Sequence, residues 1–178
     1  MEVNMNFNEL LQTNCFSQDH EEREKAAELL EINYNCEIKC FDIHPSVKFA
    51  HHARGCTVIA SKICEGVVIY QNVTIGSNLR FNKTTESWEN VGMPILAKNV
   101  IVADGAKILG PVIIGENTVV AAGAIITIDI PKNCIAFGVN KYKERDLNYD
   151  LIYNEKNIEI EEILKANEEL IKKFNQKK

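Results

Sequence analysis

Aliphatic residues recur at every sixth position in two separate stretches of the chain. The first stretch contains Ile63, Ile69 and Ile75. The second contains Leu96, Val102, Ile108, Ile114, Val120 and Ile126. Neither the 3.6-residue period of a helix nor the two-residue period of a strand gives this spacing. A period of six indicates a hexapeptide β-helix, in which each repeat forms one short strand and one corner. The pattern therefore predicts a mainly β fold, a parallel β-helix whose interior is filled by these aliphatic side chains.

Small or β-branched residues stand four positions after most of the aliphatic ones. They are Val67, Val73, Val100, Ala106, Val112, Thr118 and Ala124. We expect them at tight corners of the coil, where a larger side chain would clash. Gly or Ala often follows the aliphatic residue directly, as in Ile75-Gly76 and Ile114-Gly115.

The hydrophobic pattern divides the chain into a helical segment at 1–40, a β-helix at 41–146 and a helical tail at 147–178. Phe7, Leu10 and Leu11 indicate one short helix, and Asp19 begins a second, with acids near its positive end. The expected apolar face of the second helix is Ala26, Ala27, Leu29, Leu30 and Ile32. Because open coil ends need covering, we expect these helices to cap one end of the β-helix.

Two further segments depart from the six-residue pattern. Residues 77–95 carry no repeat and contain the only Trp, and a long loop inside a compact domain is usually functional. The tail carries an apolar stripe of Ile160, Ile163, Leu164, Leu170, Ile171 and Phe174. Such a stripe must pack on the β-helix or on a neighbouring subunit.

Composition narrows the class of protein. The 178 residues are 46% hydrophobic and 25% charged, with a net charge of −5, which argues against nucleic-acid binding. No apolar run approaches the ~18 residues of a membrane span, and the N-terminus lacks the layout of a signal peptide. Six cysteines occur without a C-x-x-C pair, so we expect reduced thiols in a cytoplasmic protein. P-loop, G-x-S-x-G and G-x-G-x-x-G motifs are absent from the sequence.

The adjacent pair His51 and His52 is the best candidate for neutral-pH proton transfer. The alternative is that the pair is polar surface at a corner of the coil. A zinc site would need three separated ligands, and only His20 and His44 remain besides the pair. We therefore expect no metal.

Four motifs carry a resemblance to a known family. They are Asp42-Ile43-His44-Pro45, the stretch from Gln71 to Gly76, the stretch from Ala103 to Gly110, and Ala121-Ala122-Gly123-Ala124. The chain from Asp42 to about Lys141 thus resembles the serine acetyltransferases and related hexapeptide acyltransferases. The resemblance implies a left-handed parallel β-helix, a homotrimer and an acetyl-CoA-dependent O-acetyltransferase. In that family a His takes the proton from an acceptor hydroxyl, which attacks the thioester directly.

The resemblance also implies a role for each motif residue. His51 or His52 would be the general base, and Asp42 would orient it. The pantetheine arm of acetyl-CoA would lie between subunits against the small-residue coils. The residues implied there are Asp104, Gly105, Ala122 and Gly123, because large side chains would hold the cofactor off the backbone. Lys141 would meet the nucleotide phosphates, or would be an ordinary surface lysine.

The spacing around the His pair departs from the family. The segment between Phe49 and Ile63 is six residues shorter than usual, which puts the role of Asp42 in question. Counting back from Ile63 in steps of six passes Thr57 and reaches His51. Matching His52-Ala53-x-Gly55 to the family's H-A-T-G instead favours His52, at the cost of a one-residue deletion. We rank His51 first.

The acceptor is also open. The family's loop motif R-H-P, which helps to hold the carboxylate of serine, reads Gly92-Met93-Pro94 here, and Met cannot pair with a carboxylate. The acceptor is therefore serine or a sugar hydroxyl, and Phe81 and Trp88 could stack on a sugar ring. A non-catalytic hexapeptide scaffold is the alternative from another class.

Overall fold

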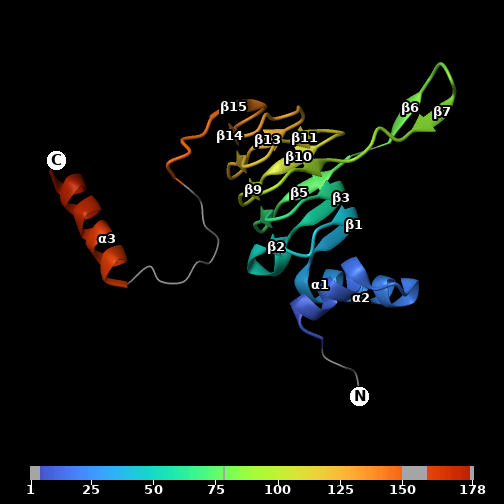
Figure 1. The fold of residues 1–178 in the computed structure, drawn as a ribbon, viewed down its shortest axis with the longest axis horizontal. Helices are drawn as coiled ribbons and strands as arrows, with labels where there is room; N and C mark the ends of the chain where they lie inside the picture. The colour runs from blue at the N-terminus through green and yellow to red at the C-terminus, as the bar shows by residue number, and fades with distance from the viewer. Residues whose placement is uncertain (1–4, 78, 150–159, 177–178) are drawn as a thin grey trace.

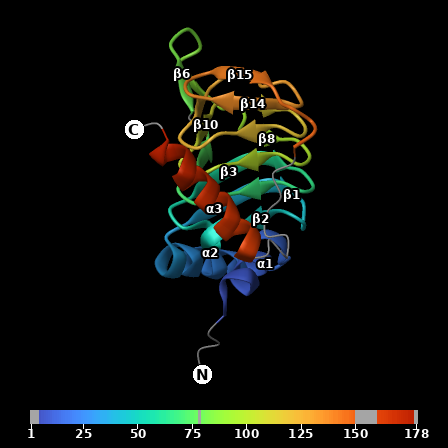
Figure 2. The same cartoon turned by 90° about the vertical axis from the view of Figure 1, so that its left-hand side faces the viewer.

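Two helices, a three-sided parallel β-helix and a further helix follow one another along the chain (Figure 1). This computed structural model describes residues 5–77, 79–149 and 160–176. The first two helices lie across one end of the β-helix, and a hairpin projects near the other end. Figure 2 shows the coils stacked in layers above these helices.

Helices α1 (Phe7–Phe16) and α2 (His20–Tyr34) begin at side-chain caps. Asn6 and Glu9 form a reciprocal capping box, and Asp19 accepts from the backbone N–H groups of Glu21 and Glu22. The apolar faces of both helices join the buried cluster that fills the β-helix, which confirms the expected cap. The buried residues are Phe7, Leu10, Ala26 and Leu30.

One residue of the expected apolar face of α2 was assigned wrongly. Ile32 is 69% exposed, because it lies on the side of α2 that faces away from the coil. The helical segment ends at Tyr34, and the first strand begins at Glu37.

Parallel strands build three faces over five coils. The first face contains the first halves of β1 (Glu37–Ile43) and β3 (Thr57–Ile63), then β5 (Thr74–Gly76), β10 (Lys107–Leu109) and β13 (Ile125–Ile126). The second face contains the ends of β1 and β3, then β8 (Ile95–Leu96) and β11 (Ile113–Ile114). The third face contains β2 (Lys48–Phe49), β4 (Val68–Ile69), β9 (Ile101–Val102), β12 (Val119–Val120) and β14 (Cys134–Phe137).

The six-residue pattern correctly identified the interior. All nine of its aliphatic residues, from Ile63 to Ile126, have no exposed surface. The seven small or β-branched residues four positions later are buried as well, with Val112 the most exposed of them at 5%. Each repeat therefore supplies one interior side chain and one corner side chain.

The count back from Ile63 through Thr57 is wrong. Val58, not Thr57, points into the interior, because β3 runs straight from the first face to the second and shortens the step to five residues. The preceding corner, from Phe49 to Val58, is longer than six residues because it holds an additional turn at Ala50–Ala53. His51 therefore does not occupy a position of the interior register.

The hairpin of β6 (Arg80–Asn82) and β7 (Ser87–Glu89) occupies most of the predicted loop. It leaves the coil after Gly76, at the edge between the first and second faces, and extends beyond the β-helix (Figure 1). The rings of Phe81 and Trp88 pack edge to face on it, with centroids 5.3 Å apart.

The last coil ends in a strand that reverses direction. Ile130 and Ala136 complete its interior, and β15 (Lys141–Glu144) pairs antiparallel with β14. Helix α3 (Ile160–Asn175) carries the predicted apolar stripe, and none of its residues is buried. Residues 150–159 and 177–178 of the expected tail lie outside the described residues. Within the described ranges, no helix combines the length and apolar character needed to cross a membrane.

Candidate functional site

One edge of the β-helix, between the third and first faces, carries a column of stacked corners. Its first positions are Arg54, Gln71, Asp104 and Ala122. Its second positions are Gly55, Asn72, Gly105 and Gly123. Three of the second-position residues donate their backbone N–H to the carbonyl of the first-position residue one coil below, from Asn72 to Arg54, from Gly105 to Gln71 and from Gly123 to Asp104. Gly55 donates instead to Asn35 at the end of α2.

The second positions of this column need a left-handed backbone. Their φ angles are 72°, 58°, 71° and 67°, which glycine adopts without steric cost. A Cβ on Gly105 would come no closer than 3.9 Å to another atom, and one on Gly123 would have none within 4 Å. The space outside these two glycines is therefore open, and the packing of the chain itself does not require their small size.

His51 and His52 lie at the base of this column, in the additional turn. His51, His52 and Ala53 are three consecutive non-glycine residues with positive φ, at 51°, 55° and 52°. Backbone strain of this kind costs of order 1–3 kcal/mol per residue and clusters at functional sites. Ala50 and Ala53 are buried on either side of the pair, so both imidazoles point outward and are exposed.

The two imidazoles have different surroundings. The His52 ring packs against Phe7 and Tyr34 of the capping helices, with centroids 5.2 and 5.7 Å away. The His51 ring lies 6.3 Å from Tyr70, which belongs to the next corner of the column. His51 therefore faces along the edge, whereas His52 faces the cap.

A pocket of about 350 Å³ separates the His turn from the next corner and is lined by His51, His52, Arg54 and Gln71. Sequence reasoning did not single out Arg54 or Gln71. A signal for Arg54 was present, since it stands where the family's H-A-T-G has Thr. Gln71 reaches the pocket only because two coils stack, and the sequence of a single repeat does not reveal this contact.

Lys141 lies at the other end of the same edge. It begins β15 opposite Phe137, where the last corner of the column turns, and its side chain is exposed. One edge therefore brings together both histidines, Lys141 and the four residues predicted for the cofactor. Those four are Asp104, Gly105, Ala122 and Gly123.

Asp42 does not join this group. It lies on β1 at the second face, and its Oδ2 accepts a hydrogen bond from the Lys62 ammonium at 2.6 Å. The side chain of Asp42 is 60% exposed and that of Lys62 is 50% exposed, so this is a surface ion pair.

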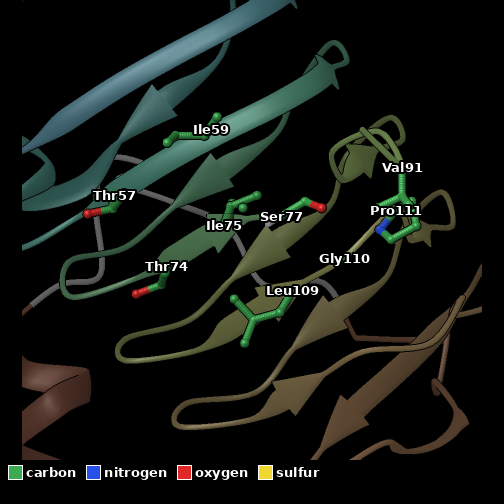
Figure 3. Close-up of a pocket in the computed structure, with 10 residues that line it drawn as sticks. Thr57, Ile59, Thr74, Ile75, Ser77, Val91, Leu109, Gly110 and Pro111 are labelled. Atoms are coloured by element: carbon green, nitrogen blue, oxygen red, sulfur yellow. The ribbon is translucent and has the colours of Figure 1, made fainter. Parts of the chain in front are cut away.

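A second hollow, of about 450 Å³, lies on the first face (Figure 3). Thr57 and Thr74 border it on one side, and Gly110 and Pro111 border it on the other side, next to Val91. Phe81 and Trp88 line neither hollow. The backbone N–H of Met93, in the altered loop motif, donates a hydrogen bond to Ser61 Oγ at 3.2 Å. This bond holds the segment on the second face.

Comparison with known proteins gives one consistent match. Residues 93–127 match the family described as bacterial transferase hexapeptide (six repeats). A Schizosaccharomyces pombe protein described provisionally as a serine acetyltransferase is 36% identical over 123 residues, covering 66% of this chain and 43% of the relative. The serine acetyltransferase of Synechococcus elongatus is 35% identical over 107 residues, covering 55% and 40%. The chain is similar to the serine acetyltransferase-like hexapeptide-repeat proteins.

Solved structures of serine acetyltransferases share the fold. Serine acetyltransferase 1 from Entamoeba histolytica superposes with a TM-score of 0.50 at 27% identity, and the match covers 67% of this chain and 44% of that one. A serine acetyltransferase in complex with CoA gives 0.51 at 19% identity, covering 73% and 53%. The chain spans less than half the length of the two curated relatives named above.

Proposed function

We propose that the chain is an acetyl-CoA-dependent O-acetyltransferase whose reaction takes place along the column edge. The observation that carries the proposal is the alignment of the strained His turn with the two open glycine corners on one edge. A scaffold protein would have no use for exposed imidazoles held in a strained turn at the end of such an edge.

His51 is the proposed general base. Its imidazole takes the proton of the acceptor hydroxyl, and the hydroxyl oxygen attacks the carbonyl carbon of the thioester. The carbon–sulfur bond then breaks, the proton passes to the departing thiolate, and free CoA and the acetyl ester result. Support for His51 over His52 comes from the rings: His51 faces the column through Tyr70, whereas His52 packs between Phe7 and Tyr34. Asp42 has no part in the proposal, since its carboxylate is bonded to Lys62.

Gly105 and Gly123 are the proposed contact for the pantetheine arm. Their open outer surface would let the arm approach the backbone, while Asp104 is held aside by the Asn72 amide, which donates to its Oδ1 at 3.0 Å. Lys141, at the end of the edge remote from His51, would pair with the phosphates. The acetyl group would thereby lie at the His end of the cofactor.

We further propose a homotrimer in which a second chain covers the open side of the column. A single chain leaves this edge exposed, and a thioester reaction needs exclusion of water. The solution mass expected from light scattering is three times the chain mass of 20.1 kDa. A monomer at catalytic concentration that still turns over acetyl-CoA would contradict the trimer and leave the reaction in place.

The cofactor site is tested by adding one methyl group at Gly123. The Gly123→Ala variant should raise KM for acetyl-CoA by about tenfold, because the Cβ meets no protein atom but projects toward the cofactor. The control is Gly92→Ala, which introduces the same kind of positive-φ strain in the loop and should leave that KM unchanged. Absence of both CoA binding and acetyl transfer in the unmutated chain would reject the enzyme.

A sugar acceptor is the second candidate. It is favoured by the exposed aromatic pair, with Phe81 47% and Trp88 68% exposed. The hairpin that carries the pair extends away from β2, the strand that leads into the His turn, so this candidate requires the hairpin to reach a neighbouring subunit (Figure 1).

A further inference from the structure

The pocket beside His51 contains a buried acceptor without a partner. Gln71 Oε1 is inaccessible to solvent and is the one such buried side-chain atom among the residues described that receives no hydrogen bond. A buried oxygen that receives no hydrogen bond destabilises the fold, so native structures seldom retain one without a function. Gln71 also lines the His51 pocket, so a ligand bound there that displaces the Gln71 amide is the source we infer for the missing donor.

The same pocket contains a cation without a carboxylate. Arg54 lies in its lining, and no Asp or Glu of the described ranges lies within 4.0 Å of the Arg54 guanidinium. The nearest acidic residue in the column, Asp104, is two coils away and accepts from Asn72. This absence occurs in a chain of net charge −5, where acidic partners are in excess.

We propose that this pocket binds the acceptor by its carboxylate, with Arg54 as the anchor and Gln71 Oε1 accepting from a second donor of the acceptor. This inference rests on the proposed function, because it places the acceptor hydroxyl at His51. Arg pairs with a carboxylate through two parallel N–H donors, which fixes orientation as well as affinity. The class of acceptor is a small hydroxy acid bearing an N–H or O–H donor such as an ammonium group.

Carboxylate recognition in this chain would lie on the column edge and not at the loop motif that the family uses. In this chain the loop motif reads Gly92-Met93-Pro94 and these three residues offer no cation, while the backbone of Met93 is tied to Ser61 on the second face. Arg54 instead projects from the column itself, two residues after His52. The charge needed for an acidic acceptor is thus supplied next to the base and not from the loop.

The test compares acceptors that differ in one group, using the full chain and measuring release of free CoA. The acceptors are L-serine, L-serinamide, glycerate and glucose. The unmutated protein should acetylate serine with a kcat/KM at least about tenfold above that for serinamide, which lacks the carboxylate. In Arg54→Gln that ratio should fall close to one, and Arg54→Lys should restore part of it. Arg23→Gln, an exposed arginine of α2, should keep the full ratio.

Gln71→Leu gives an independent readout. It removes the carbonyl while retaining the volume, and should lower kcat/KM for serine more than for glycerate, which has no ammonium group. An Arg54→Gln variant that raises KM for acetyl-CoA and keeps the serine-to-serinamide ratio would overturn the proposal and assign Arg54 to the cofactor. Preferential turnover of glucose would overturn it too and leave the acetyltransferase intact. Turnover of no acceptor at all would reject both.

Discussion

At the scale of single residues, Gly76 and Gly115 have the same sequence context and different surroundings. Each follows an interior isoleucine, and neither has a positive φ. A Cβ on Gly115 would lie 2.4 Å from the Lys132 nitrogen and 2.6 Å from the Pro131 carbonyl carbon, both backbone atoms that cannot move aside easily. A Cβ on Gly76 would have no atom within 4 Å.

The Gly115→Ala variant should therefore be destabilised by about 1–3 kcal/mol, the usual cost of overpacking. Gly76→Ala should be neutral or should stabilise the protein by up to about 1 kcal/mol, since alanine narrows the unfolded ensemble. Urea unfolding of both variants measures the difference. Equal effects would mean that the last coil does not pass as close to Gly115 as the structure shows.

The interior residues were predictable from sequence because each repeat has one buried position at a fixed spacing. Val58 was not predictable. Strand β3 continues straight across two faces without a corner, so the spacing between the interior residues Val58 and Ile63 is five and not six. The strained His turn was unpredictable for a similar reason. Three successive left-handed residues have no composition signal, and the turn is anchored by the buried side chains of Ala50 and Ala53.

At the scale of elements, the capping helices act through a few apolar side chains. Leu30 of α2 is 1% exposed, whereas Ile32 of the same helix is 69% exposed. Leu30→Ala should lower the free energy of unfolding by about 2–5 kcal/mol, because the cavity opens at the end of the coil. Ile32→Ala should change it by less than about 0.5 kcal/mol. Thermal or urea unfolding compares the two, and similar losses would show that α2 packs in another orientation.

Buried and partly buried thiols at the junction of cap and coil predict instability at alkaline pH. Burial raises the pKa of Cys36, and of Cys40, to about 12 from an ordinary value of 9.0, and raises the pKa of Cys15 to about 11. Above pH 9 the unfolded chain loses these protons and the folded chain retains them. The stability is therefore complete below pH 9 and falls as pH rises toward 12, by up to about 1.4 kcal/mol per pH unit for each thiol.

The measurement is the free energy of unfolding from pH 8 to 11, with Cys36→Ala as the comparison. Removal of this thiol should make the decline shallower, because one proton fewer is lost on unfolding. An unchanged slope in Cys36→Ala would contradict a protonated thiol at this site.

At the scale of the whole molecule, the stacking of the coils brings residues that are distant in the sequence to one edge. His51, Asp104, Gly123 and Lys141 are spread over about half of the sequence and lie along one side of the β-helix. The family resemblance suggested that Asp104 and Gly123 share one site, and the regular repeat explains why their corners align, because the same position in each coil returns to the same edge. The repeat did not place His51, which lies in an additional turn. It could not place Asp42, whose strand turns onto another face, or reveal the pocket of Arg54 and Gln71 between two coils.

The central claim is that His51, at the base of this edge, is the base for acetyl transfer from acetyl-CoA. The most direct measurement is the rate of CoA release by His51→Ala and by His52→Ala, with CoA affinity determined in parallel by calorimetry. His51→Ala should lose at least about 100-fold in kcat and retain CoA binding, as expected when a general base is removed. His52→Ala should lose far less, because its ring packs on Phe7 and Tyr34. Loss of activity in His52→Ala alone would contradict the account and assign the base to His52.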